Sequence, residues 1–495
     1  MKKQAFNPFL PPDVCIPDGE PHIFGDRVYL YGSHDLEGGW TFCMGDYTVY
    51  SAPLSDLSDW RCEGVIYRAE QDPDFAERPY MYAPDVVQGK DGRFYLYYCM
   101  SGKFGFGGYY GPISAAVCDE PAGKYEYLGY VRYKDGTPMK KYVCFDPCIF
   151  NDSGRMLLYY GTQYQGEAND ILASDEKKLT DVMHRYNKSR EEILSTPDNV
   201  NGPAVAELED DMLTVKGEPH HIIPYEADFG GHEFFEASSM RKVGGKYYFI
   251  YSSQQNHELC YAVSDFPDRG FEFGGTIVSN GDIGVNGVTS ETRMNMTGTT
   301  HGSIIEISGQ WYVFYHRLTH KSDYSRQACA ERIDIAPDGT IKQAEMTSCG
   351  LNGAPLRGEG TYPAVIACNI TNGHMPHGSN SIYSDSFPNV THRSAGNVTE
   401  RFIGEISDNT LIGYKYFRFE GLGSITLTVR GSGNFAVSTS LTGEPICTVS
   451  FDSPDCWSRA TAEASLPDGV YPIYLRYSGS STAELKELCF NCHNV

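Results

Sequence analysis

Five segments of the chain share one hydrophobic pattern, in which a turn containing glycine is followed by alternating aromatic and branched apolar residues. The segments are residues 25–35, 92–100, 154–162, 245–253 and 309–317. A tyrosine follows the glycine by five or six residues in every copy, at Tyr31, Tyr97, Tyr159, Tyr251 and Tyr315. Alternation after a turn glycine is typical of the second strand of a β-hairpin. The pattern therefore predicts five such strands.

The spacing of these tyrosines predicts how the strands are arranged. The intervals are 66, 62, 92 and 64 residues, and four copies are followed by a second apolar run, at residues 49–60, 113–125, 171–181 and 259–271. We interpret these runs as third strands. A period near 64 residues with several strands per copy indicates a five-bladed β-propeller. The 92-residue interval implies an insertion of about thirty residues, expected near residues 184–225. Unrelated hairpins in a sandwich are the alternative.

The pattern changes near residue 350. Residues 349–363 are rich in glycine and proline and are interpreted as a linker. Beyond them, residues 414–421, 424–433, 435–443 and 470–480 alternate polar and apolar positions between Gly/Ser turns, which predicts an antiparallel β-sandwich. The chain is therefore predicted to be all-β, with a propeller domain at residues 1–350 and a sandwich at residues 351–495.

Composition narrows the choice of partners. The chain has 64 acidic and 40 basic residues, for a formal net charge of −24, which disfavours binding to nucleic acid or to a membrane surface. The N-terminal segment has two lysines but no apolar run typical of a signal peptide, and the 15 cysteines are expected to be reduced thiols in a cytoplasmic protein. Cys489, Cys492 and His493 have no second CxxC pair, so no zinc site is expected there.

Polar residues stand where the inner strand of each blade should begin. Counting back 12 to 15 residues from each tyrosine gives a carboxylate in four copies and a histidine in the fifth: Asp18, Asp85, Asp146, Glu236 and His301. Inner strands of a propeller converge on one channel. Because buried carboxylates are costly without partners, a functional site explains this set better than packing does. Glu233 lies outside this range of offsets and is expected at a rim or in a loop.

Paired carboxylates suit glycoside hydrolysis. One must be protonated, to donate to the leaving oxygen, and the other ionised, to activate water or attack the sugar. A third carboxylate nearby raises the pKa of the acid by like-charge repulsion.

At these residues the sequence resembles glycoside hydrolase family 43, over roughly residues 5–340. The resemblance implies that Asp18 is the general base, that Glu236 is the general acid, and that Asp146 orients this acid and raises its pKa. It also implies an inverting reaction with no covalent intermediate. His301 matches an axial histidine that in many members holds a calcium ion through water, so Ca²⁺ near His301 is a candidate cofactor.

The motif "YAPD" at residues 82–85 stands where the family usually has Trp-Ala-Pro-Asp. Tyr82 can still stack on a sugar. Asp85 is expected to hold backbone amides or, alternatively, to take part in catalysis. The segment "EASSM" replaces Glu-Gly-Pro after the acid, which leaves the subfamily open.

Further candidates are less constrained by the pattern. Arg293 and His34 are predicted to contact substrate. Asp35, at the end of the first patterned segment, is expected to edge the pocket or to cap a turn, and the same is expected of His316 and Arg317 at the end of the fifth. His220, His221 and His232 are expected at the rim or in a solvated loop. The tail resembles sandwiches related to carbohydrate-binding module family 6, with Trp457, Tyr414 and Tyr416 as sugar platforms, unless it only packs on the propeller.

The sequence therefore predicts an enzyme that removes α-L-arabinofuranosyl or β-D-xylosyl residues from plant-derived oligosaccharides. One alternative is a propeller glycoside phosphorylase, which needs a cationic phosphate pocket, and no cluster of Arg, Lys and His is evident at the predicted axis. The other is a non-catalytic sugar-binding propeller. The choice between arabinosidase and xylosidase, and the oligomeric state, stay open.

Overall fold

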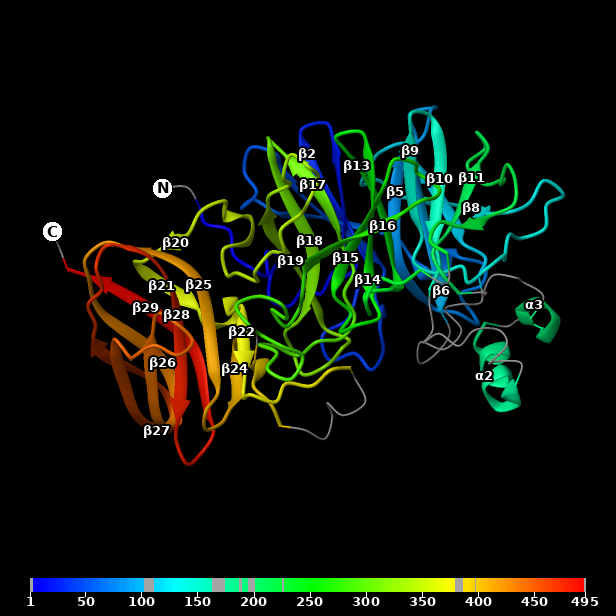
Figure 1. Ribbon diagram of the computed structural model, residues 1–495. Coiled ribbons are helices and arrows are strands. Elements are labelled where there is room, and N and C mark those ends of the chain that lie inside the picture. Colours follow the sequence, from blue (N-terminus) through cyan, green and yellow to red (C-terminus); the bar gives the residue numbers. More distant parts are fainter. Residues whose placement is uncertain are drawn as a thin grey trace.

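The computed structural model describes residues 3–101, 111–162, 174–186, 189–194, 201–224, 227–378, 386–396 and 398–493. These residues form two bodies of β-structure that lie side by side, a ring of five small sheets and one larger sheet formed by the C-terminal part of the chain (Figure 1). The predicted all-β class is confirmed.

The five small sheets follow one another along the chain. The first contains β1 (Glu20–Phe24), β2 (Arg27–Tyr31), β3 (Tyr47–Pro53) and β4 (Arg61–Tyr67). The second contains β5 (Tyr80–Gln88), β6 (Phe94–Ser101), β7 (Ser114–Cys118) and β8 (Glu126–Tyr130). The third contains β9 (Cys148–Asp152), β10 (Arg155–Tyr160), β11 (Ala204–Leu208) and β12 (His220–His221). The fourth contains β13 (Phe234–Val243), β14 (Lys246–Ser253), β15 (Leu259–Ser264) and β16 (Glu272–Val278). The fifth contains β17 (Ser303–Ile307), β18 (Gln310–Leu318) and β19 (Arg326–Ile333).

Each patterned tyrosine lies on the second strand of its sheet, so the prediction of a five-bladed propeller is confirmed. Neighbouring blades enclose hydrophobic cores between them. The first and fifth blades also share a core, in which Leu30 packs in one cluster with Phe314. The N-terminal segment reinforces this closure, since the Phe9 N–H donates to the Ala328 carbonyl at 3.2 Å. The ring is therefore closed by apolar burial between the two ends of the propeller sequence.

The third blade differs from the prediction. Residues 171–181 were expected to form its third strand, but residues 176–181 belong to a helix, α2 (Glu176–Tyr186), and 171–173 lie outside the described residues. The third strand is β11, and the extra chain lies between β10 and β11, earlier than the expected 184–225. It carries α2 and α3 (Arg190–Leu194), which lie on the side of the propeller away from the C-terminal sheet (Figure 1). No helix in the described part of the chain is long and apolar enough to cross a membrane.

The C-terminal sheet folds around its own apolar core as the predicted β-sandwich. Its strands are β20 (Leu356–Arg357), β21 (Gly360–Pro363), β22 (Asn369–Thr371), β23 (Asn389–Ala395), β24 (Val398–Ile406), β25 (Leu411–Phe419), β26 (Leu422–Ser438), β27 (Cys447–Glu463), β28 (Gly469–Ser478) and β29 (Ala483–Cys492). Residues 424–433 and 435–443 were expected to form two strands, but β26 runs through all of the first and the first four residues of the second. The backbone passes Gly431 at φ 116°, a conformation that glycine adopts without steric cost, so this glycine bends a strand instead of ending it.

A buried ion pair joins the two bodies. Lys415 of β25 lies 2.8 Å from Asp282 and 3.0 Å from Glu345, both of which belong to the propeller side of the chain. The side chains of Lys415 and Asp282 are only 2% and 4% exposed. A charge buried this far needs its partner in place, so this contact fixes how the sandwich sits on the ring.

Candidate active site

A cavity of about 320 Å³ lies where the five inner strands begin. It takes one polar or aromatic residue from the start of each blade: Asp18, Tyr82, Asp146, Glu236 and His301. The propeller register thus brings together five residues that are far apart in the sequence. Gly378, which follows the last propeller strand by many residues, also lines the cavity.

The four patterned carboxylates are not at equivalent depths, contrary to the expectation from the offsets. Tyr97 pairs with Asp85 itself, whereas Tyr31 pairs with Glu20, two residues after Asp18. Asp146 likewise lies two residues before Cys148, the partner of its blade tyrosine. Asp18 and Asp146 therefore belong to an upper level that lines the cavity, and Asp85 belongs with Glu20 to a level beneath it.

The backbone is strained at the upper level. Asp18, Asp146 and Ala237 have φ angles of 57°, 45° and 71°, a left-handed conformation that non-glycine residues rarely adopt. Glu236 precedes Ala237 at an irregularity in the pairing of β13 with β14. Such positions cost about 1–3 kcal/mol each and collect at functional sites, where they aim side chains that a regular strand would not present.

Asp18 is held by a cation and by a neutral histidine. Arg326 Nη1 donates to Asp18 Oδ1 at 2.9 Å. The Asp18 N–H donates to His316 Nδ1 at 3.1 Å, while His316 Nε2 lies 2.8 Å from the Thr299 carbonyl, an arrangement that requires the proton on Nε2. Burial alone would raise the pKa of Asp18, but the charge of Arg326, together with smaller contributions from His316, His301 and a hydrogen bond from Ser33, holds this pKa below its usual range. Burial lowers the pKa of His316 to about 3, so this imidazole stays neutral.

Arg326 is the main site residue that the sequence pattern did not indicate. Asp35 fixes it by accepting from Nε at 2.8 Å and from Nη2 at 3.0 Å, and its guanidinium lies 4.8 Å from the ring of Phe42. Asp35 had been placed only at the pocket edge or in a turn, and it is in fact 1% exposed. Arg326 begins β19, a third strand, which carries no repeat of its own in the patterned segments.

Glu236 and Asp146 form a pair of carboxyl groups with raised pKa values. Burial raises the pKa of Glu236 to about 8, and the charge of Asp18 adds to this shift. Burial and the charge of Glu236 likewise raise the pKa of Asp146. The Ala237 N–H donates to Asp146 Oδ2 at 3.0 Å, which favours the ionised form of Asp146, whereas no described residue donates a hydrogen bond to Glu236. A proton shared by the pair is therefore better placed on Glu236.

His301 connects the cavity to the lower level. Its Nδ1 lies 3.7 Å from Asp146 Oδ2 and its Nε2 lies 3.9 Å from Glu20 Oε1. Burial lowers the pKa of His301 to about 4, so the ring is neutral. Asp85, beneath, lies 2.6 Å from His22 Nε2 and accepts from the Ile149 N–H at 2.8 Å. The carboxylate of Asp85 thus ties together the first three blades.

Aromatic rings form the walls of the cavity. The ring centroids of Tyr82 and Phe145 lie 5.7 Å apart, and those of Phe42 and Tyr324 lie 4.7 Å apart in an edge-to-face pair. Phe235 completes the set at 4.5 Å from His257. Ring faces beside carboxylates are typical of sites that bind the apolar faces of sugars.

Two predicted substrate contacts lie outside the cavity lining. Arg293 donates through Nε to the Ser290 carbonyl at 2.6 Å and through Nη1 to Thr297 Oγ1 at 3.2 Å. His34 Nδ1 lies 2.8 Å from the Asp46 carbonyl. Both side chains hold loops, and the cavity takes its arginine from β19 instead.

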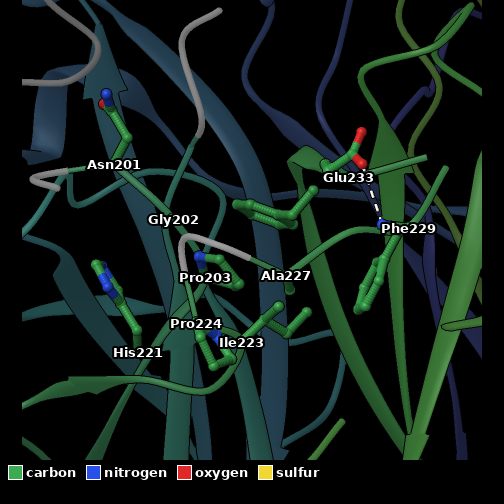
Figure 2. A pocket seen from close by; sticks show the side chains of 10 residues that line it. Asn201, Gly202, Pro203, His221, Ile223, Pro224, Ala227, Phe229 and Glu233 are labelled. Carbon is green, nitrogen blue, oxygen red and sulfur yellow. Dashed lines mark hydrogen bonds between the residues drawn. The ribbon is translucent and has the colours of Figure 1, made fainter. Parts of the chain in front are cut away.

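Glu233, His220, His221 and His232 do not line this cavity. Glu233 accepts from the N–H groups of Phe229 and Gly231 at 3.0 and 3.2 Å and borders a separate space of only about 20 Å³ that His221 also lines (Figure 2). This volume holds about one water molecule. Arg317 pairs with Glu331 at 3.0 Å in the interior of the fifth blade.

The three aromatic candidates of the sandwich have different surroundings. Tyr414 is fully buried, so its prediction as a sugar platform is wrong. Tyr416 donates to Glu345 Oε2 at 2.6 Å at the junction between the two bodies. Trp457 is half-buried and donates through Nε1 to Glu400 Oε2 at 3.0 Å.

Comparisons with known proteins agree with this geometry. The family model described as Glycosyl hydrolases family 43 matches residues 7–341. A relative named Xylosidase/arabinosidase, from Thermoclostridium stercorarium, is 43% identical over 508 residues, which cover 98% of this chain and 98% of that protein.

Two solved structures are similar in fold. A family 43 arabinoxylan arabinofuranohydrolase from Bacillus subtilis, in complex with cellotetraose, is 18% identical with a TM-score of 0.50 and covers 98% of this chain and 97% of its own, so the likeness spans both bodies. A family 43 β-xylosidase/α-arabinofuranosidase from a compost microbial metagenome, in complex with xylotriose and in a calcium-free form, is 26% identical with a TM-score of 0.50. It covers 68% of this chain and 96% of its own.

Proposed function

Because this chain belongs to glycosyl hydrolase family 43 and is a glycoside hydrolase, we propose that it releases β-D-xylosyl or α-L-arabinofuranosyl units from arabinoxylan-type oligosaccharides with inversion. The name of its relative of matching length, xylosidase/arabinosidase, supports this substrate class. The observation that carries the proposal is the pairing, in one cavity, of an aspartate held ionised with a glutamate whose pKa is raised to about 8.

We assign the general base to Asp18. Arg326 lowers the pKa of its carboxyl, so Asp18 is ionised at neutral pH and can accept a proton from water as that water attacks the anomeric carbon. The hydrogen bond from its own N–H to His316 fixes the backbone beneath the carboxylate. Direct attack by water inverts the configuration of the anomeric carbon.

We assign the general acid to Glu236. At neutral pH its raised pKa keeps it protonated, so it can donate to the leaving oxygen. The Ala237 N–H that donates to Asp146 Oδ2 favours the ionised form of Asp146. Once Glu236 has given up its proton, repulsion between the two carboxylates would favour its taking a proton back from solvent. The volume of about 320 Å³ is at the lower end for ligand sites and supports binding of a chain end instead of an internal stretch of polymer.

The phosphorylase alternative is disfavoured by the charges of the cavity. No axial Arg/Lys/His cluster was evident from the sequence, yet Arg326, His301 and His316 do meet there. Both histidines are neutral, and the guanidinium of Arg326 is already occupied by Asp18 and Asp35. No cation of this set is free to bind phosphate.

The donors around His301 fit a calcium ion only with help from water. Ca²⁺ takes 6–8 oxygen ligands, and His301 offers nitrogen. Glu20 Oε1, 3.9 Å from His301 Nε2, is buried and has no hydrogen-bond partner among the described residues. Glu20 and His301, through ordered waters, would therefore hold a bound Ca²⁺, which would supply positive charge beneath Asp146.

The assignment is tested with Asp18→Asn and Glu236→Gln on nitrophenyl β-D-xyloside and α-L-arabinofuranoside. We expect kcat/KM to fall by at least about 10³-fold in each, because each substitution removes the carboxyl group that donates or accepts the proton. Glu233→Gln is the matched control, since this glutamate holds a loop beside a separate space. Full activity in Asp18→Asn or Glu236→Gln contradicts the assignment.

The stereochemistry is a second, independent readout. Proton NMR of the first sugar released from a xylooligosaccharide should show the α-anomer of xylose. Release of the β-anomer would contradict direct attack by water, and turnover that requires phosphate would favour the phosphorylase.

A further inference from the structure

A second cluster of metal-binding side chains lies in the fourth blade, outside the lining of the cavity. His232 precedes β13, Glu258 immediately precedes β15, and Cys260 lies within β15. One ligand atom from each of the three residues lies within 4.8 Å of the others. Glu258 and Cys260 are buried, and the side chain of His232 is 24% exposed.

The distances match the edges of a tetrahedral zinc site. His232 Nδ1 lies 3.0 Å from Glu258 Oε2 and 3.8 Å from Cys260 Sγ. With Zn–N and Zn–O near 2.1 Å and Zn–S near 2.3 Å, tetrahedral angles place these pairs roughly 3.4 and 3.6 Å apart. These two edges therefore fit after side-chain shifts of a few tenths of an ångström, and the third edge, between Glu258 and Cys260, is no longer than 4.8 Å.

The surroundings hold the histidine in place. Its ring stacks on Phe273 at 5.2 Å with an interplanar angle of 11°, and its carbonyl accepts from Tyr251 Oη at 2.7 Å. Thr276 Oγ1 lies 3.5 Å from Cys260 Sγ and 3.4 Å from Glu258 Oε2, so one hydroxyl reaches both other ligands. Outer contacts of this kind orient the ligands of metal sites.

We propose that His232, Glu258 and Cys260 bind a thiophilic divalent cation, with Zn²⁺ as the best fit and water as the fourth ligand on the exposed side of His232. The thiolate selects against Ca²⁺ and Mg²⁺, which prefer oxygen ligands. Binding replaces the proton of the thiol with the metal and releases that proton to solvent. The alternative is an ordinary His–Glu ion pair beside a buried thiol.

A metal here would tie the start of β13 to the start of β15. The Gln254 N–H already donates to the Glu233 carbonyl at 2.9 Å, between these two segments. Glu236 lies four residues after His232 on the same segment, and His257, next to Glu258, lines the cavity. The site would therefore stabilise the two segments of the fourth blade that border the catalytic cavity, without contacting substrate.

The test is metal titration of the full-length protein after removal of metal with a chelator. We expect one equivalent of Zn²⁺ to bind with release of protons, and Co²⁺ to produce the intense near-ultraviolet absorption of a thiolate–cobalt bond. His232→Gln and Cys260→Ala should each weaken Zn²⁺ binding by at least about 100-fold, because each removes one of three ligands. Zn²⁺ should raise the melting temperature of the unaltered protein and leave that of both variants unchanged.

The matched control is Cys492→Ser. Cys489 and Cys492 lie three residues apart on β29 and therefore point to opposite faces of the strand. We expect this variant to bind Zn²⁺ and Co²⁺ as the unaltered protein does. Binding that survives in His232→Gln and Cys260→Ala but disappears in Cys492→Ser would overturn the proposal, as would the absence of any stoichiometric binding or of the thiolate–cobalt band.

Discussion

Glu37 is a contact between the two bodies that lies two residues from Asp35, which holds Arg326 beside the proposed base Asp18. Its carboxylate accepts two hydrogen bonds of 2.7 Å from Arg401 of β24 and lies 3.0 Å from His392 Nδ1 of β23. His320, from the fifth blade, lies 3.2 Å away. Two residues before Glu37, Asp35 holds the arginine that pairs with the base. We predict that Glu37→Gln loosens the junction and lowers activity together.

The size of the effect follows from the burial of the pair. The side chains of Glu37 and Arg401 are each 15% exposed, so their interaction falls between an exposed ion pair, worth about 0.2–1 kcal/mol, and a fully buried one, whose breakage costs about 3–5 kcal/mol. Glutamine keeps one acceptor and the side-chain shape. We therefore expect a loss of about 2 kcal/mol, or roughly 2–3 °C in melting temperature for a chain of this length.

The dependence on pH has a definite sign. Burial alone would raise the pKa of Glu37, but hydrogen bonds from His320 and Arg401 and their charges hold it well below its usual range. A depressed pKa in the folded state gives stability that is present above the pKa of the unfolded chain, about 4.3, and is lost as the pH falls further toward the folded value. The difference between Glu37→Gln and the unaltered protein should therefore be full at pH 7 and shrink below about pH 4.

The assay is a thermal unfolding scan at pH 7 and pH 4, together with kcat/KM on a nitrophenyl glycoside at 25 °C. Glu405→Gln is the matched control, because Glu405 pairs with Lys321 across the same junction at 3.0 Å but both side chains are more than a third exposed. We expect a shift of no more than about 1 °C in this control. Equal shifts in the two variants, or a Glu37→Gln effect that grows at pH 4, would refute the reasoning.

Three further outcomes follow from the charges of the buried residues. The rate kcat/KM should fall above about pH 8 as Glu236 loses its proton, and a pH–rate profile with no alkaline decline up to pH 10 would contradict this. Lys415→Met should cost about 3–5 kcal/mol, because Asp282 is left buried and unpaired; the double variant with Asp282→Leu should recover part of this loss in the same unfolding assay. Arg326→Lys should lower kcat at least about 10-fold and move the acid limb of the pH–rate profile upward, since a lysine cannot reproduce the geometry in which one guanidinium is forked onto Asp35 and also donates to Asp18.

The propeller could be predicted because its second strands repeat a local signal. A turn glycine followed by alternating apolar residues is set by strand geometry and recurs in every blade, so Tyr31 and Tyr315 could be aligned without a structure. The extra chain of the third blade has no such signal, and residues 171–181 were therefore taken for a strand although α2 occupies most of them. A short apolar run by itself does not distinguish a strand from a helix.

The level at which each carboxylate lies in the channel could not be predicted from the number of residues between it and its blade tyrosine, because the hairpin turns differ in length. Two residues separate β1 from β2, whereas five separate β5 from β6. The offsets of Asp18 and Asp85 thus differ by one residue, yet Asp18 lines the cavity and Asp85 lies beneath it. Arg326 could not be predicted for a similar reason. It begins β19, and only the folded structure shows that this third strand starts beside the propeller axis.

The ionised state of the proposed base depends on contacts that exist only when the ring of blades is closed. Asp18 comes from the first blade and Arg326 from the fifth, so the two meet only when the first and last blades share their core. Arg326 is in turn held by Asp35, and the sandwich holds the same loop through Glu37. Gly378, which follows the first sandwich strands, closes part of the cavity wall. The C-terminal part of the chain therefore supports the surroundings of the proposed base at two points, Glu37 and Gly378. A propeller expressed without the sandwich should therefore keep its β-structure but lose activity.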